Sequence, residues 1–214
     1  MKLTMRQLIE KLDLKEIEKR LAEDPQLANE GIPLHETDLR MGHPLHRICD
    51  NVIKGVYRDE DAVELAKLFL KYGANIDGYA PEIKKDTPLI AAASLLAEKT
   101  GILYIERGAN IHHQGCHGGT ALHWAAWVGK DKLVKRLIEA GADIHLRCID
   151  FTSTPLFWAI HGYKASGKSN LNNQIECARL LLQAGADKTV PNANGQQPVE
   201  ILDEEDTALL SLLQ

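Results

Sequence analysis

The sequence predicts an all-α fold, a solenoid of stacked helix–turn–helix repeats joined by β-hairpin-like turns. One string recurs as HPLHRIC, TPLIAAA, TALHWAA and TPLFWAI, beginning at His43, Thr87, Thr120 and Thr154. A second string recurs as YGANI, RGANI, AGADI and AGADK, with its glycine at Gly73, Gly108, Gly141 and Gly185. The strings alternate with a basic period of about 33 residues. No helix pair of this size buries its apolar face alone, so the copies must stack on one another.

Each copy has recognisable helix boundaries. Thr87, Thr120 and Thr154 can accept hydrogen bonds from first-turn amides, which suits a helix N-cap. A proline follows in three of the copies, at the first helical position, where a missing amide costs nothing. The second helix, for example DKLVKRLIEA, carries its apolar residues on one face and ends at Gly141. The segment from that glycine to the next threonine is about a dozen residues, which leaves room only for a turn or hairpin.

The motif TPLHxA, a second helix and then GAD, repeated with this period, resembles the ankyrin repeat. The resemblance implies an ankyrin-repeat α-solenoid over 1–214 as a single domain. Its expected parts are an N-terminal capping helix pair over 1–40, repeats over 41–86, 87–119, 120–153 and 154–196, and a C-terminal capping repeat over 197–214. The first and fourth copies carry 9 or 10 extra residues. We expect these insertions, at 50–61 and 161–174, to form protruding loops between the two helices of their copies.

Composition and charge exclude several classes of function. The hydrophobic content of 44% supplies a packed core, and the net charge of −5 argues against a sequence-independent grip on nucleic acid or anionic lipid. No stretch approaches the roughly 18 apolar residues of a spanning helix. The four cysteines show no paired spacing, and no export signal accompanies them. We therefore expect a monomeric cytoplasmic protein that has no cofactor and binds neither nucleic acid nor membrane.

Two alternatives involve a small ligand. The segment Gly162–Ser169 matches the spacing of a phosphate-binding loop and would make this a nucleotide-binding protein, but no strand is predicted before it. A zinc-stabilised array would draw its ligands from the turns of two adjacent copies, namely His112, His113, Cys116, His117, His145 and Cys148. Those spacings match no known zinc motif, which favours structural histidines at turn positions over metal ligands.

The remaining hypothesis is a non-catalytic module that binds another protein. In a fold that resembles ankyrin stacks, the hairpin tips and the exposed side of each first helix form a concave face. Mapping the copies onto that face gives eight candidate partner-binding residues: Tyr79, Leu95, His113, Trp127, Val128, Arg147, Phe151 and His161. Trp124 and Trp158 occupy the position that normally packs inward and are predicted to be core. For Trp127 a binding role and burial under the adjacent hairpin both remain open.

Overall fold

The structure is a computed structural model that describes residues 3–35, 37, 40–80, 82–166 and 171–214. The chain divides into two compact units, residues 1–81 with 87–110, and residues 82–86 with 111–214. Each unit is described by itself below. The predicted single domain over 1–214 stays a prediction.

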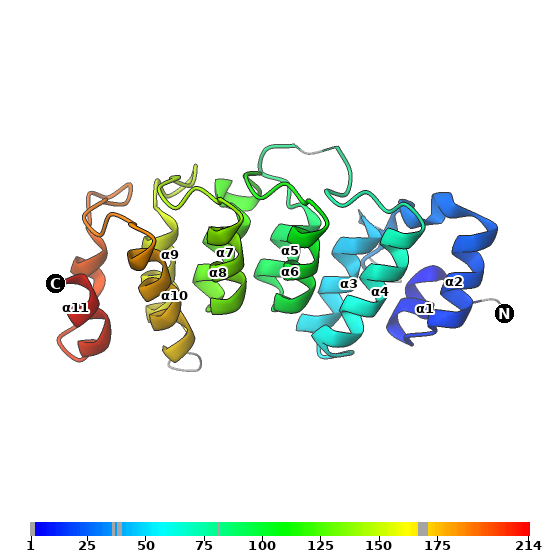
Figure 1. Ribbon diagram of the computed structural model, residues 1–214, viewed down its shortest axis with the longest axis horizontal. Coiled ribbons are helices and arrows are strands. Elements are labelled where there is room, and N and C mark those ends of the chain that lie inside the picture. The colour runs from blue at the N-terminus through cyan, green and yellow to red at the C-terminus, as the bar shows by residue number, and fades with distance from the viewer. Residues whose placement is uncertain (1–2, 36, 38–39, 81, 167–170) are drawn as a thin grey trace. The chain divides into compact units, whose positions relative to one another are not determined.

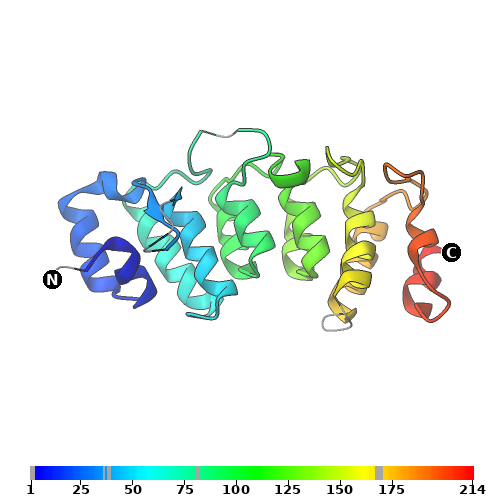
Figure 2. The same ribbon diagram turned by 180° about the vertical axis from the view of Figure 1, so that it is seen from behind.

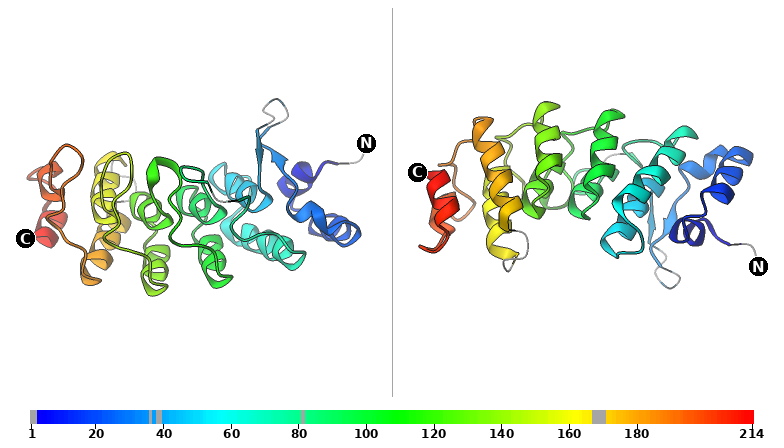
Figure 3. Two further views of the ribbon diagram at one scale, coloured as in Figure 1. Left: turned by 90° about the horizontal axis from the view of Figure 1, so that it is seen from above. Right: turned by 60° about the horizontal axis from the view of Figure 1, so that its bottom comes forward.

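The first unit consists of helix pairs and one short strand pair (Figures 1 and 2). Its elements are α1 (Met5–Glu10), α2 (Leu14–Glu23), η1 (Pro25–Ala28), β1 (Ile32–Pro33), β2 (Met41–Gly42), α3 (Pro44–Ile53), α4 (Asp59–Lys71), α5 (Pro88–Ser94) and α6 (Glu98–Glu106). Helix α3 packs on α4 and α5, and α6 packs on α4 and α5. The strands β1 and β2 pair antiparallel and lie beside α3 (Figure 3). The predicted stacking of helix pairs is therefore present in this unit.

The second unit repeats the same arrangement. Its elements are η2 (Cys116–Gly118), α7 (Ala121–Val128), α8 (Asp131–Glu139), α9 (Pro155–Ala165), α10 (Leu171–Gln183), η3 (Pro198–Ile201) and α11 (Thr207–Leu213). The first helices α7 and α9 pack directly on each other, as do the second helices α8 and α10. Among the described residues, no helix combines the length and apolar character needed to cross a membrane.

The predicted helix starts are confirmed. The Thr87 and Thr154 side chains accept hydrogen bonds from the amides of Ile90 and Phe157, at 3.4 and 3.3 Å. At Thr120 the cap is completed by His123, whose Nδ1 accepts from the Thr120 amide at 3.1 Å. Nε2 of the same ring donates to the carbonyl of Ser153 at 3.2 Å, which links α7 to the turn before α9.

The two insertions differ from the expected protruding loops. Helix α3 continues to Ile53 and α9 continues to Ala165, and α4 and α10 begin at Asp59 and Leu171, so much of 50–61 and of 161–174 is helical. Residues 167–170 of the second insertion lie outside the described residues. The extended end of α9 is held by Lys164, whose Nζ forms ion pairs with Asp203 and, at 2.8 Å, with Asp206. This long-range anchoring explains why a polar, glycine-containing segment remains helical.

Candidate functional site: an aromatic cavity in the second unit

Four aromatic side chains of the second unit come from equivalent positions of two consecutive copies. Trp124 and Trp127 lie on α7, and Trp158 and His161 lie in the same two positions on α9. The two helices approach closely because Gly162 has no side chain. A Cβ at Gly162 would lie 2.2 Å from the backbone oxygen of Trp127. This close packing brings the aromatic rings of the two copies together.

The rings meet edge to face. Trp158 lies at the centre, with ring centroids 5.1 Å from Trp124 and 5.9 Å from Trp127, at interplanar angles of 81° and 71°. The Trp127 ring also contacts His161, at 4.9 Å and 68°. Edge-to-face contacts of this kind are favourable for aromatic pairs. Rings inclined so steeply enclose a space, whereas stacked rings would leave a flat surface.

The space they enclose is a cavity of about 500 Å³. This volume is within the range of small-ligand pockets, roughly 300–1,000 Å³. Its wall comprises the aromatic and histidine side chains and part of the C-terminal segment: His117, Trp124, Trp127, Asp150, Phe151, Ser153, Phe157, Trp158, His161, Asn192, Ala193, Asn194, Gln196 and Ile201. We call this site the aromatic cavity.

The wall opposite the indoles is held in place by backbone hydrogen bonds. The amide of Ala193 donates to the carbonyl of Phe151 at 2.9 Å, which fixes the C-terminal loop against the hairpin tip. Arg147 strengthens the same junction by donating to the carbonyls of Thr152 and Pro191, each at 2.6 Å. These hydrogen bonds therefore hold the C-terminal segment in place as part of the wall of the aromatic cavity.

Charge at the aromatic cavity is confined to its rim. Oδ1 of Asp150 pairs with Lys84 Nζ at 2.6 Å, and its Oδ2 lies 3.1 Å from His117 Nδ1. The hydrogen bonds from Lys84 and then His117 lower the pKa of the Asp150 carboxyl. Burial lowers the pKa of His161.

The two indole nitrogens differ in their hydrogen bonding. Within the described residues, the buried Nε1 of Trp124 has no hydrogen-bond partner, whereas Nε1 of Trp158 donates to Cys148 Sγ at 3.4 Å.

Three of the eight candidate residues, Trp127, Phe151 and His161, come together in the wall of the aromatic cavity. The other three in the second unit have separate positions. His113 Nε2 bonds the carbonyl of Lys85 at 2.8 Å, Arg147 holds the junction described above, and Val128 ends α7. Tyr79 and Leu95 belong to the first unit, where Tyr79 is 48% exposed and Leu95 is half-buried.

The prediction for Trp158 as a core residue is confirmed, since 5% of it is exposed. The prediction for Trp124 is wrong, because its side chain is partly exposed and lines the aromatic cavity. Ala91, at the equivalent position of the second copy, is fully buried. The recurrence of Trp at this position in two successive copies, which from the sequence alone is interpreted as core packing, is the signal that could have located the site.

The residues considered for zinc and nucleotide lie in other arrangements. Cys148 is buried against Trp158, and His117 faces Asp150. In the part of the chain that the structure describes, no three His, Cys, Asp or Glu side chains gather as metal ligands. The phosphate-loop pattern Gly162–Ser169 begins inside α9 rather than after a strand, and Gly167, Lys168 and Ser169 lie outside the described residues.

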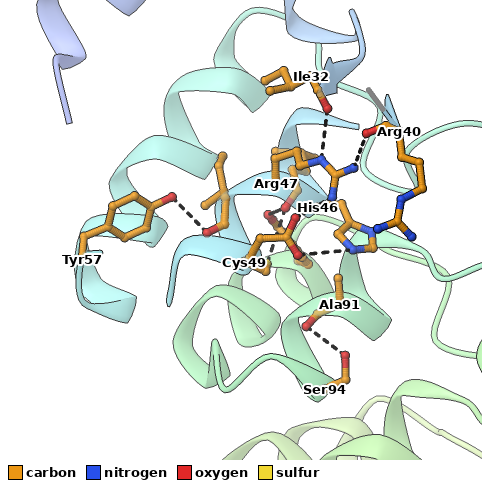
Figure 4. A network of polar contacts seen from close by, with 12 residues as sticks. Ile32, Arg40, His46, Arg47, Cys49, Tyr57, Ala91 and Ser94 are labelled. Atoms are coloured by element: carbon orange, nitrogen blue, oxygen red, sulfur yellow. Dashed lines mark hydrogen bonds and ion pairs between the residues drawn. The ribbon is translucent and has the colours of Figure 1, made fainter. Parts of the chain in front are cut away.

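The equivalent positions of the first copy, in the first unit, carry opposite charges instead of rings (Figure 4). Arg47 and Asp50 form an ion pair of 2.6 Å and are each 13% exposed. The same guanidinium donates to the carbonyls of Ile32 at 3.1 Å and Arg40 at 2.9 Å, which ties α3 to the strand pair. This network satisfies its own donors and leaves no aromatic surface.

Comparison with known proteins gives relatives with the same repeats. A family model for ankyrin repeats (3 copies) matches residues 53–148 and 96–192. Palmitoyltransferase ZDHHC13 of Mus musculus is 32% identical over 97 residues, covering 45% of this chain and 14% of that protein. Protein phosphatase 1 regulatory subunit 12A of Mus musculus is 35% identical over 97 residues, covering 45% and 8%. SH3 and multiple ankyrin repeat domains protein 2 of Homo sapiens is 26% identical over 254 residues, covering 86% and 14%. The chain spans less than a fifth of the length of each of these relatives.

Proposed function

Because the chain belongs to the ankyrin-repeat family, we propose that it is a non-catalytic module that binds another protein through the concave side of its repeats. The family supports a binding role, and fold alone specifies no partner. The observation that carries the proposal is the aromatic cavity. Its wall contains all three tryptophans of a chain with 5% aromatic residues.

The aromatic cavity has the features of an interface anchor site. Tryptophan is enriched among residues that dominate binding energy, and such residues lie in pockets surrounded by polar groups. Here the polar groups are supplied by Asn192, Asn194 and Gln196 of the C-terminal segment, where Asn192 Nδ2 donates to Gln196 Oε1 at 3.2 Å. A partner side chain that enters the aromatic cavity would displace water from the exposed parts of Trp124, Trp127 and Phe151.

The test is selection of a displayed random peptide library on the whole chain, followed by affinity measurement on variants. We expect Trp127→Ala to weaken the selected peptides by about thirtyfold, equivalent to ~2 kcal/mol at an anchor site. Phe151→Leu should also weaken them. Leu14→Ala is the control, because Leu14 is a 37% exposed apolar residue at the start of α2 in the first unit and is not one of the candidate binding residues. If the selected peptides bind Trp127→Ala and Phe151→Leu with unchanged affinity, the binding surface lies outside the aromatic cavity.

A further inference from the structure

The kind of aromatic surface in the cavity carries information about its occupant. A pocket for an aliphatic side chain needs only apolar surface, which leucine or isoleucine provides. This cavity is instead lined by Trp124, Trp127, Trp158 and Phe151. The face of an aromatic ring is electron-rich, and indole attracts cations more strongly than phenyl or phenol rings. The composition therefore favours a positively charged group over a neutral one of the same shape.

The arrangement of the rings suits a compact cation. Trp124 and Trp127 are inclined at 81° and 71° to Trp158, and their centroids are 5.1 and 5.9 Å from it. A cation interacts with a ring when it lies within about 6 Å of the centroid. Because these rings touch one another edge to face, a cation in the aromatic cavity would contact the parts of the indole faces that line it and that the neighbouring rings leave uncovered.

The charges around the aromatic cavity agree with a cationic occupant. Among the lining residues that the structure describes, Asp150 is the one acidic side chain, and none is lysine or arginine. Lys84 pairs with Oδ1 of Asp150 at 2.6 Å and is not among the residues that line the aromatic cavity. Burial, which lowers the pKa of His161, favours the uncharged imidazole at neutral pH.

Hydrogen bonding decides which cation fits. An unmodified lysine ammonium has three N–H donors that need acceptors when it leaves water. Both oxygens of Asp150 are already engaged, one by Lys84 and one by His117. A trimethylated ammonium keeps its charge and has no N–H to satisfy. We propose that the aromatic cavity recognises a trimethyl-lysine side chain of the partner protein. The proposal rests on the function proposed above and specifies the chemistry of the anchor.

The experiment uses the full chain and three small probes. These are N-acetyl-trimethyllysine methylamide, the same compound with unmodified lysine, and a neutral analogue in which carbon replaces the charged nitrogen. The chain has 3 tryptophans and all of them line the aromatic cavity, so indole N–H signals in a ¹H–¹⁵N spectrum report binding directly. We expect the trimethylated probe to shift these signals and to bind about fivefold or more tightly than the neutral analogue.

Two substitutions separate cation recognition from simple apolar contact. Trp127→Leu keeps an apolar side chain and removes an indole face, so it should erase the preference for the charged probe. Lys84→Gln releases the Asp150 carboxylate and should strengthen the charged probe by about two- to fivefold, while leaving the neutral analogue unchanged. Lys84 is 52% exposed, so this change leaves the fold intact. Leu14→Ala, in the first unit, is again the control.

Equal or tighter binding of the neutral analogue would overturn the inference, and so would equal binding of unmodified lysine. Absence of any indole shift with the trimethylated probe at millimolar concentration would overturn it as well. None of these outcomes affects the peptide-selection result, because peptides that insert an apolar anchor would still depend on Trp127. The failure of the ligand assignment is therefore distinguishable from the failure of the proposed function.

Discussion

The same two positions of the repeat have opposite chemistry in the two units. In the first copy they hold Arg47 and Asp50, which neutralise each other and hydrogen-bond the nearby backbone. In the third and fourth copies they hold indole and imidazole rings that surround a cavity of about 500 Å³. The backbone is alike in both places, because α3, α7 and α9 each begin at a capping residue.

The difference lies in how the side chains use the space in front of the first helix. The Arg47 guanidinium fills that space, since a Cβ at Gly42 would approach its atoms to 2.5 Å. Rigid rings that meet edge to face cannot fill the corner in this way, and a void remains. The comparison indicates that caps and glycines build the repeat, whereas these two positions decide whether its surface is closed by internal contacts or open to a partner.

The largest expected effect comes from Gly162→Ala. Alanine in a helix usually stabilises by up to about 1 kcal/mol relative to glycine. Here the added Cβ would lie 2.2 Å from the Trp127 oxygen, so α7 and α9 must separate. Overpacking typically costs about 1–3 kcal/mol, and a clash with backbone belongs at the upper end of that range, so Gly162→Ala should destabilise the protein rather than stabilise it. Urea unfolding measures the loss, and tryptophan fluorescence of the folded variant should change as the aromatic cavity opens. A stabilised variant would show that close helix approach does not form the site.

Acid should destabilise both units, because each contains a buried neutral histidine at a first helix. Burial lowers the pKa of His43 and of His123 to about 4 each. In the unfolded chain each has a pKa near ~6.5, so between these values the unfolded state binds more protons and acidification favours it. Each histidine should contribute a loss of up to about 3 kcal/mol as the pH falls from 6.5 to 4. Urea unfolding midpoints measured between about pH 4 and 6.5 test this prediction. In His123→Gln the free energy of unfolding should depend less steeply on pH.

The local parts of the fold could be predicted from the sequence. Thr87 and Thr154 act as caps because capping depends on the residue and the amides next to it. Phe151 and His161 were placed on the concave side by counting positions within a repeat, and both line the aromatic cavity. The repeat period therefore predicts the course of the backbone and the side of the repeat on which Phe151 and His161 lie.

Contacts between distant residues could not be predicted. Helix α9 continues through Lys164 because Asp203 and Asp206, in the C-terminal segment, hold its ammonium group. The outer wall of the aromatic cavity likewise depends on the hydrogen bond from Ala193 to Phe151. No periodic pattern encodes either contact, since each joins a repeat to a segment outside the repeat string.

Arg47→Met tests the closed surface. The variant loses the bonds to the carbonyls of Ile32 and Arg40 and leaves the largely buried Asp50 without its guanidinium partner. We expect a loss of about 2 kcal/mol in the free energy of unfolding. The double variant Arg47→Met, Asp50→Leu removes the unpaired charge and should be more stable than the single one. A double variant whose loss equals the sum of both single losses would show that the ion pair is not a unit.

The smallest expected effect on stability is that of Trp127→Ala, and it sharpens the contrast with Arg47. Truncation of a fully buried tryptophan costs about 3–5 kcal/mol, whereas surface substitutions stay within about 0.5 kcal/mol. Trp127 is half-buried, with one edge against Trp158 and His161 and the rest lining the aromatic cavity. We therefore expect an intermediate loss of about 1–2 kcal/mol, measured as a lower urea midpoint with an unchanged slope.

The stability of Trp127→Ala has to be read together with its binding. If the ring acts mainly on a partner, the loss in affinity for selected peptides exceeds the loss in unfolding free energy. If the ring is chiefly a core residue, the stability loss reaches the range of about 3–5 kcal/mol and binding falls only because the fold is weakened. Trp158→Ala supplies the reference for a core position, since 5% of Trp158 is exposed. A Trp127→Ala variant that unfolds as easily as a variant truncated at Trp158 would remove the distinction between a closed first copy and an open third one.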